Sequence, residues 1–349
     1  MLGLPSRTVV LGSGIFFFLV ALLAPAVVLT KFQTLEFVYV WAFAIAIVGL
    51  NLLTGYCGQI SLGNSAFMAI GGYATALLAV DRGWSPLATI PVAAAVAAAG
   101  GILVGIPALK LRGLYLGLAT FALALSAPSV IRHFDTFTGG SQGIYIRGAG
   151  KDPFGLVDGG ALTSEQWLYY LSLVLFVLLF LFIRALLKSD VGRAFRSIRD
   201  RETVAVANGV SLTYYKTLAF AISALFAGVG GSLDVMATSY IAPDSFDVNV
   251  ALALLVGAAV GGLGTQAGPI VGAIFTVWAP NYTQKIFHGS PGIVYGALLI
   301  LIMYVMPDGS VGGFFRLLNL RSRLRRRATT PPGGLAKAAV DVATESKHR

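Results

Sequence analysis

The stretch Trp167–Ile183 reads WLYYLSLVLFVLLFLFI and carries no charged side chain from end to end. Comparable runs cover Thr8–Leu29, Phe37–Leu53, Ile60–Val80, Leu87–Ala108 and Leu114–Ile131. A helix needs about 20 apolar residues to cross the hydrocarbon core of a bilayer. Because these runs are continuous instead of alternating, they predict transmembrane helices and not the strands of a barrel. We therefore predict an all-α, polytopic transmembrane helix bundle.

The composition supports a membrane protein, with 56% hydrophobic residues, 11% charged residues and 42 glycines among 349 residues. The net charge of +10 does not indicate nucleic-acid binding, because most of it lies in one internal loop and the C-terminal tail. A single cysteine, Cys57, excludes an internal disulfide framework. The three histidines are scattered without metal-ligand spacing, so we expect neither a metal nor a cofactor.

The hydropathy pattern predicts about ten crossings with both termini in the cytoplasm. Basic residues concentrate in the loops that this topology places inside, as the positive-inside rule requires. The N-terminal run is longer than a typical signal-peptide core, so we interpret it as an uncleaved first span. The predicted spans are Thr8–Leu29, Phe37–Thr54, Ile60–Val80, Leu87–Ala108, Leu114–Ile131, Trp167–Leu187, Tyr214–Met236, Val250–Leu263, Ala267–Ile286 and Ile293–Met306.

The chain divides into a transmembrane domain, residues 1–315, and a basic tail, residues 316–349, which we expect to be disordered. Within the domain, residues 132–166 form a long external loop with partial order, and residues 189–210 form a basic internal loop. In the tail, Arg321–Arg327 is a basic stretch beyond the last predicted span, and basic residues next to a membrane favour anionic lipid head groups. A partner-binding site remains the alternative for this stretch.

Two regions place glycines and uncharged polar groups at membrane depth. In the first, polar side chains in hydrocarbon would each need a partner, so they are expected to face protein or a watery cavity. A broken helix that lines a translocation path accounts for this region, with simple packing as the alternative. The candidate path residues are Asn51, Thr54, Gln59, Ser61 and Asn64.

The second region carries glycines at four-residue spacing, the pattern that lets helix backbones approach closely. Close packing is the simplest interpretation of these glycines. The two regions occupy comparable places in the two halves of the chain, which suggests an inverted repeat as a hypothesis. The glycines are Gly257, Gly261, Gly264, Gly268 and Gly272.

Ionisable residues are missing from the centres of the predicted spans, where ion- or proton-coupled carriers usually need them. The chain also has no G-x-x-x-x-G-K-[ST] loop to hold nucleotide phosphates. If ATP drives transport, another chain must bind it. No covalent chemistry is expected.

The internal loop Ser189–Val210 has a helical apolar face and an opposite face of arginines and acids. Arg196 and Asp200 are four residues apart and could pair along a helix. Gly209 suits a left-handed helix stop. Its mixed charge favours docking in a protein groove, while an interfacial helix on lipid is the alternative.

Several motifs in this order resemble the permeases of branched-chain amino acid ABC importers. The likeness covers roughly residues 37–307, and the external Thr-Gly-Gly element is similar to that of the larger of the two permease subunits. The motifs are NLLTGYCGQISLGNSAFMAIGGY (residues 51–73), TGGSQG (138–143), SIRDRE (197–202), YIAPDSF (240–246) and GGLGTQAGP (261–269).

The resemblance implies an ATP-driven importer in the bacterial inner membrane. It would comprise a second permease subunit, two ATP-binding subunits and a periplasmic substrate-binding protein. The family's ATPase-contacting loop corresponds to Arg199, Asp200, Glu202, Ala205 and Gly209. The loop expected to face the binding protein holds Thr138, Gly139, Gly140, Ser141 and Gln142.

The substrate stays open at this point. Branched-chain or other hydrophobic amino acids are the first expectation, but permeases for urea and short amides share much of the signature. Asn64 stands where a histidine is frequent in the family, and Val204 and Val206 replace smaller or acidic residues. From the residues without the resemblance, an ion-coupled carrier and a non-transporting receptor also remain as alternatives.

Overall fold

The computed structural model describes residues 30–111, 113–146 and 162–286, together with positions 296, 300, 304 and 309. Within these residues six helical segments are long and apolar enough to cross a membrane. They confirm the predicted all-α, polytopic bundle, and the chain is a multi-pass membrane protein. The segments are Lys31–Tyr56, Pro86–Ala108, Leu114–His133, Ser164–Lys188, Leu212–Thr238 and Pro243–Gly261.

Two further helices, α3 (Asn64–Asp81) and α12 (Gly268–Ile286), correspond to the third and ninth predicted spans. The first predicted span and the basic tail lie outside the described residues, as does the tenth predicted span apart from positions 296, 300 and 304. The other elements in chain order are α2 (Lys31–Leu50), η1 (Asn51–Tyr56), α4 (Pro86–Ala108), α5 (Leu114–His133), α6 (Asp135–Thr138), η2 (Gly140–Gln142), β1 (Ile144–Tyr145), α7 (Ser164–Lys188), α8 (Asp190–Asp200), α9 (Glu202–Ala207), α10 (Leu212–Thr238), β2 (Tyr240–Ile241), η3 (Pro243–Phe246) and α11 (Val248–Gly261).

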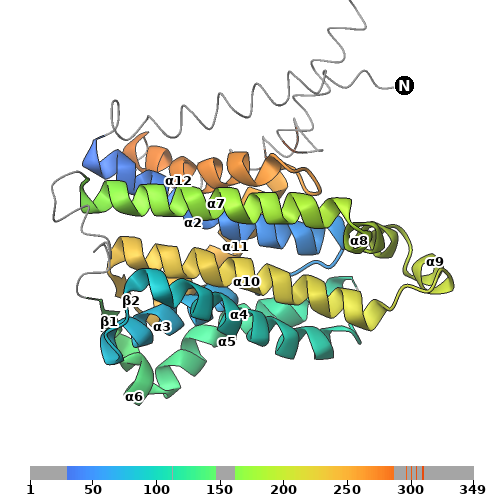
Figure 1. Cartoon of the computed structure of the whole chain (residues 1–349), viewed down its shortest axis with the longest axis horizontal. Helices are drawn as coiled ribbons and strands as arrows, with labels where there is room; N and C mark the ends of the chain where they lie inside the picture. Colours follow the sequence, from blue (N-terminus) through green and yellow to red (C-terminus); the bar gives the residue numbers. More distant parts are fainter. Residues whose placement is uncertain are drawn as a thin grey trace, which may run out of the picture.

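Helix α10 lies at the centre of the bundle and packs against α2, α3 and α4 (Figure 1). Glycines allow the backbones of these helices to approach each other closely. A Cβ atom at Gly231 of α10 would lie 2.0 Å from the carbonyl oxygen of Met68 in α3, which is too close for any side chain. Helices α11 and α12 pack in the same manner, because a Cβ at Gly272 would lie 2.0 Å from the oxygen of Gly257. The close packing predicted from the glycine spacing is thus confirmed.

Helices α2 and α7 lie side by side and begin with the same cap. Thr30 and Thr163 each accept a hydrogen bond from the backbone of a glutamine three residues on, and the glutamine side chain returns to the cap backbone. This capping box satisfies orphan N–H groups at a helix start. It explains why α2 begins at Lys31, before the predicted Phe37.

The connections gather at two opposite ends of the bundle (Figure 1). One end carries α8 and α9, and the other carries α6, β1 and β2. Strands β1 and β2 are antiparallel, with Ile144 opposite Ile241 and Tyr145 opposite Tyr240. Within the predicted loop 132–166, the structure describes the short elements α6, η2 and β1.

The predicted helix break is also present. Helix α2 continues as a π-helix, η1, and residues 57–63 are not helical before α3 begins at Asn64. The start of the third span was therefore predicted too early, at Ile60. The second glycine region forms a turn between α11 and α12, where Gly262 and Gly264 have φ of +108° and +76°.

Candidate functional site

The two regions that break the helical pattern contact each other through Asn51. Its Nδ2 donates to the carbonyl oxygen of Thr265 at 2.8 Å, and its Oδ1 accepts from the backbone N–H of Gly264 at 2.7 Å. Asn51 is 4% exposed, so both bonds replace water at a buried carboxamide. The side chain joins the start of η1 to the α11–α12 turn.

The other polar residues of the first region also find partners within the protein. Thr54 donates to the backbone oxygen of Gln59 at 3.1 Å, and Ser61 accepts from the N–H of Gly63 at 3.3 Å. Asn64 donates to Ser223 Oγ of α10 at 3.2 Å. Thr54, Ser61 and Asn64 thus bond to protein atoms, and Gln59 is buried with 6% of its surface exposed. Whether they line a path stays a prediction.

Arg199, near the end of α8, reaches from the basic loop into the same region. Its Nη1 donates to the carbonyl oxygen of Gly55 in η1 at 2.7 Å. The C-terminal turn of a helix leaves carbonyls without intrahelical donors and carries partial negative charge. The guanidinium therefore caps the end of the α2–η1 segment, while its Nε lies 3.6 Å from Asp200 Oδ1.

Arg196, one turn earlier on α8, makes the equivalent contact with α7. Its Nη1 donates to the carbonyl oxygen of Leu187 at 3.2 Å, at the C-terminal end of that helix. The predicted Arg196–Asp200 pair is wrong: Asp200 is 3.6 Å from Arg199, and Arg196 turns back toward α7. A helix carbonyl within reach competes with an exposed carboxylate, which gains little from pairing in water.

The apolar face predicted for the basic loop is confirmed. Ala194, Phe195 and Ile198 of α8 and Ala205 of α9 are buried. Gly209 follows the end of α9 with φ of +80°, which confirms the predicted left-handed stop. The loop therefore packs on the bundle with one face and presents the other to the outside.

Glu202 and Lys216 tie α9 to the first turns of α10. The Lys216 Nζ lies 2.6 Å from Glu202 Oε1, and the lysine side chain is only 4% exposed. Removing one partner of such a pair would leave a desolvated charge. Arg199 and Glu202 thus both make contacts within this chain.

The outward face of α8 and α9 is exposed and mixes charged with apolar side chains. Asp200, Arg201, Thr203, Val204 and Val206 are exposed, the two valines by 48% and 52%. Exposed valines beside charged groups at the end of a membrane bundle form a mixed surface that suits a protein partner.

At the opposite end, the predicted Thr138–Gln142 loop is held by local bonds. Thr138 donates to the carbonyl oxygen of Ile131, and Gly139 and Gly140 have positive φ. The hydroxyl of Tyr240 donates to the Gln142 oxygen at 2.9 Å. Ser141 and Gln142 remain exposed, so this loop is ordered and accessible.

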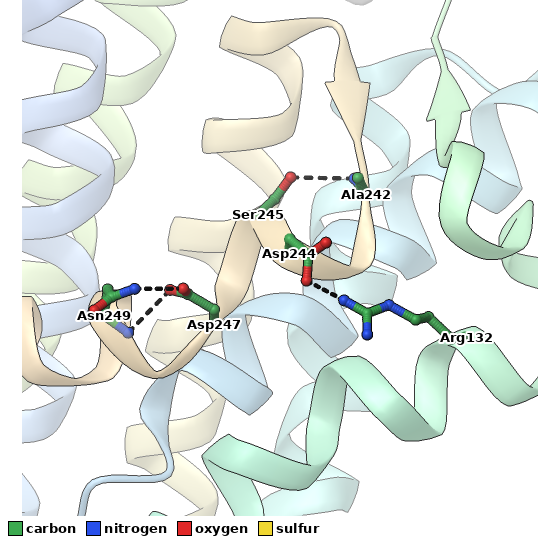
Figure 2. A network of polar contacts seen from close by, with 6 residues as sticks. All are labelled: Arg132, Ala242, Asp244, Ser245, Asp247 and Asn249. Atoms are coloured by element: carbon green, nitrogen blue, oxygen red, sulfur yellow. Dashed lines mark hydrogen bonds and ion pairs between the residues drawn. The ribbon is translucent and has the colours of Figure 1, made fainter.

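A polar network links the same end to α11 (Figure 2). Arg132 of α5 pairs with Asp244 of η3, and Ser245 Oγ accepts from the N–H of Ala242 at 3.1 Å. Asp247 caps α11 by accepting from the N–H of Asn249 at 2.9 Å and from its Nδ2 at 2.6 Å. Figure 2 shows these contacts arranged around the η3 turn, which fixes the connection between β2 and α11.

Cys57 lies directly after η1, next to the Arg199 contact, and is fully buried. Burial raises the pKa of its thiol to about 12, and the nearby Lys216 and Glu202 charges act on it in opposite directions. A neutral thiol is a weak nucleophile. Among the described residues, His, Cys, Asp and Glu form no group of three or more that could hold a metal.

Sequence reasoning did not identify Gly55, Gly58 or Lys216 as parts of this site. The glycines were visible in the motif, but their role depends on an arginine that follows some 140 residues later. Lys216 lies within the predicted span Tyr214–Met236. Its position, in the first turns of an apolar span, was the signal that it needed a buried partner.

Comparison with known proteins assigns the family. The family model described as "Branched-chain amino acid transport system / permease component" matches residues 34–306. The high-affinity branched-chain amino acid transport system permease protein LivM of Salmonella typhimurium is 31% identical over 280 residues, 75% of this chain and 66% of that protein. LivM of Escherichia coli is 31% identical over 318 residues, 84% of this chain and 74% of that protein.

The aligned part thus spans just under two thirds of the Salmonella relative. No solved structure matches this chain significantly. The names of both relatives describe transport permeases, the class of protein that the motifs predict. Their match, together with a family model that covers most of the chain, shows that this protein belongs to the branched-chain amino acid transport permease family.

Proposed function

We propose that the chain is a pore-forming subunit of an ATP-driven importer for branched-chain or other hydrophobic amino acids. It lies in the bacterial inner membrane with α8 and α9 on the cytoplasmic side. A separate ATPase docks on the exposed face of α8 and α9, and a periplasmic binding protein delivers substrate at the end that carries Thr138–Gln142.

The observation that carries this proposal is the position of the two candidate docking elements. The α8–α9 pair and the loop at Thr138–Gln142 lie at opposite ends of one bundle of apolar helices (Figure 1). A transport subunit without a nucleotide-binding motif needs a separate ATPase to supply energy and a binding protein to supply substrate. Opposite ends allow the two partners to act on the same helices from the two sides of the membrane.

The α8–α9 loop is also bonded to membrane helices, so a displacement of the loop by the ATPase would move those helices. Arg196 joins it to α7, Arg199 to η1, and Glu202 to α10. Rigid helices transmit a displacement of their ends over their whole length. Alternating access then follows from the movement of helices and requires no ionisable group in the pore.

The substrate class rests on the relatives, whose names specify branched-chain amino acid transport. An uncharged translocation path suits a zwitterion that the binding protein has already selected, because strong binding in the pore would slow release. Urea and short amides are the second candidate class, since the first region offers amide and hydroxyl groups and no charges.

Reconstitution tests this function. The chain is placed in vesicles with its second permease, its ATPase and its binding protein, and labelled leucine, another amino acid and urea are compared. We expect leucine uptake that requires internal ATP and all partners. Preference for urea would correct the substrate class, and uptake by the chain alone under an ion gradient would replace the proposal by an ion-coupled carrier.

A further inference from the structure

We propose that Arg199 is an intramolecular latch which joins the basic loop to the broken end of the α2–η1 helix, and that it is not a contact to the ATPase. This inference rests on the proposed function for its role in transport. Its structural part, the latch itself, stands on contacts within this chain.

Three segments far apart in sequence meet at the guanidinium. Nη1 of Arg199 donates to Gly55 O at 2.7 Å. The arginine belongs to α8, the glycine to η1, and the α11–α12 turn lies against both through Gly264. Among the described residues of α8, Arg199 is the one whose side chain forms a hydrogen bond with η1.

The surroundings leave room for the arginine only because they lack side chains. A Cβ at Gly58, which has φ of +74°, would lie 2.9 Å from Arg199 Cγ. A Cβ at Gly264 would lie 3.2 Å from Arg199 Nη1, and a Cβ at Gly55 would lie 2.3 Å from the Gly264 nitrogen. Gly58 and Gly264 therefore leave room for Arg199, whose side chain is 45% exposed, while Gly55 allows the α11–α12 turn to approach η1.

The same glycine turn is also held by Asn51. Its two bonds to Gly264 and Thr265 and the Arg199 bond to Gly55 form one connected cluster. A displacement of α8 must either carry Gly55 and the turn with it or break a charge-assisted hydrogen bond. The Gly55 carbonyl belongs to the π-helix η1, an irregular helical geometry that is frequent at functional sites.

Cys57 provides a direct readout of this cluster, because it is the one cysteine of the chain, is buried, and adjoins Gly58. In the isolated chain, Arg199→Ala should speed maleimide labelling of Cys57 at least fivefold, and Arg199→Lys by less, because lysine keeps one donor. Arg193→Ala is the matched control on the same helix, since Arg193 pairs with the exposed Asp190, and it should not change the rate.

In the reconstituted complex, ATPase copurification with Arg199→Ala should stay within twofold of wild type. The amount of leucine imported per ATP hydrolysed should fall at least tenfold, with partial recovery in Arg199→Lys. A residue with only a structural role would lower hydrolysis and uptake together and leave their ratio unchanged.

Two results would overturn the latch. One is Cys57 labelling of Arg199→Ala at the wild-type rate, and the other is loss of the ATPase in proportion to the loss of uptake, which would make Arg199 a docking contact. Failure of the proposed function can be told apart from failure of the latch. A wild-type chain that binds no ATPase contradicts the proposed function, while Cys57 labelling in the isolated chain still tests whether Arg199 acts as a latch.

Discussion

Asn51 accepts a hydrogen bond from the backbone N–H of Gly264, 213 residues later in the sequence, with 2.7 Å between its Oδ1 and the Gly264 nitrogen. The same carboxamide donates to Thr265, so both of its polar ends are used. One side chain thereby joins two helix interruptions that the sequence places in different halves of the chain. This contact makes the broken regions a single structural unit.

Replacing Asn51 should therefore destabilise the protein. Asn51→Ala leaves the Gly264 N–H and the Thr265 carbonyl without these partners in a buried site, which costs roughly 1–3 kcal/mol. Asn51→Asp keeps the acceptor for Gly264 but places an acceptor against the Thr265 oxygen. Thermal unfolding in detergent should show a lower Tm for both. Asn281→Ala, an exposed site, is the control, and equal Tm values in all variants would contradict the role of Asn51.

The Glu202–Lys216 pair should respond as a buried ion pair does. Glu202→Gln leaves the Lys216 ammonium, 4% exposed, without its carboxylate, and should destabilise the fold by roughly 3 kcal/mol. The double variant Glu202→Gln/Lys216→Met removes the uncompensated charge and should recover part of that loss. A double-mutant cycle on unfolding free energy measures the coupling. Strict additivity of the two single effects would show that the pair contributes nothing.

Packing of α11 on α12 should not tolerate a side chain at Gly272. Because a Cβ there meets the Gly257 oxygen, Gly272→Val forces the helices apart and should cost about 1–3 kcal/mol. Gly117→Ala on α5 is the matched control, since its nearest neighbour would be Ile60 Cγ2 at an ordinary 3.4 Å. Proteolysis of the purified protein should increase for the valine variant alone. Unchanged digestion of both would argue against close packing.

Cys57 should be almost unreactive in the folded protein. Burial favours the neutral thiol and raises its pKa from 9.0 to about 12, so the thiolate fraction at pH 8 falls by about 10³-fold. Maleimide labelling in mild detergent should therefore be far slower than in denaturant at the same pH. Equal rates in the two conditions would mean that the loop after η1 is open to solvent.

The sequence predicted the elements whose signals are local. Helix α7 begins and ends within a few residues of its predicted bounds, because charged residues flank an unbroken apolar run. The buried face of α8 followed from the spacing of Phe195 and Ile198. The break after Tyr56 followed from the glycines and polar groups around it.

Contacts between distant segments could not be predicted in this way. Nothing near Asn51 in the sequence shows that its partners lie beyond residue 260, and nothing near Arg199 points to Gly55. The Arg196–Asp200 pair was predicted from their spacing along the helix. It does not form, because Arg196 instead donates to the Leu187 carbonyl oxygen. The roles of the path, docking and delivery residues remain predictions.

The central claim is that the ATPase docks at the end of the bundle that carries α8 and α9. Site-specific photocrosslinking tests this claim most directly. A photoreactive amino acid is placed at position 204, exposed on α9, or at position 145, exposed at the opposite end. In the assembled complex, we predict that position 204 crosslinks to the ATPase and position 145 does not. Crosslinking of the ATPase to position 145, or to neither position, would contradict the account.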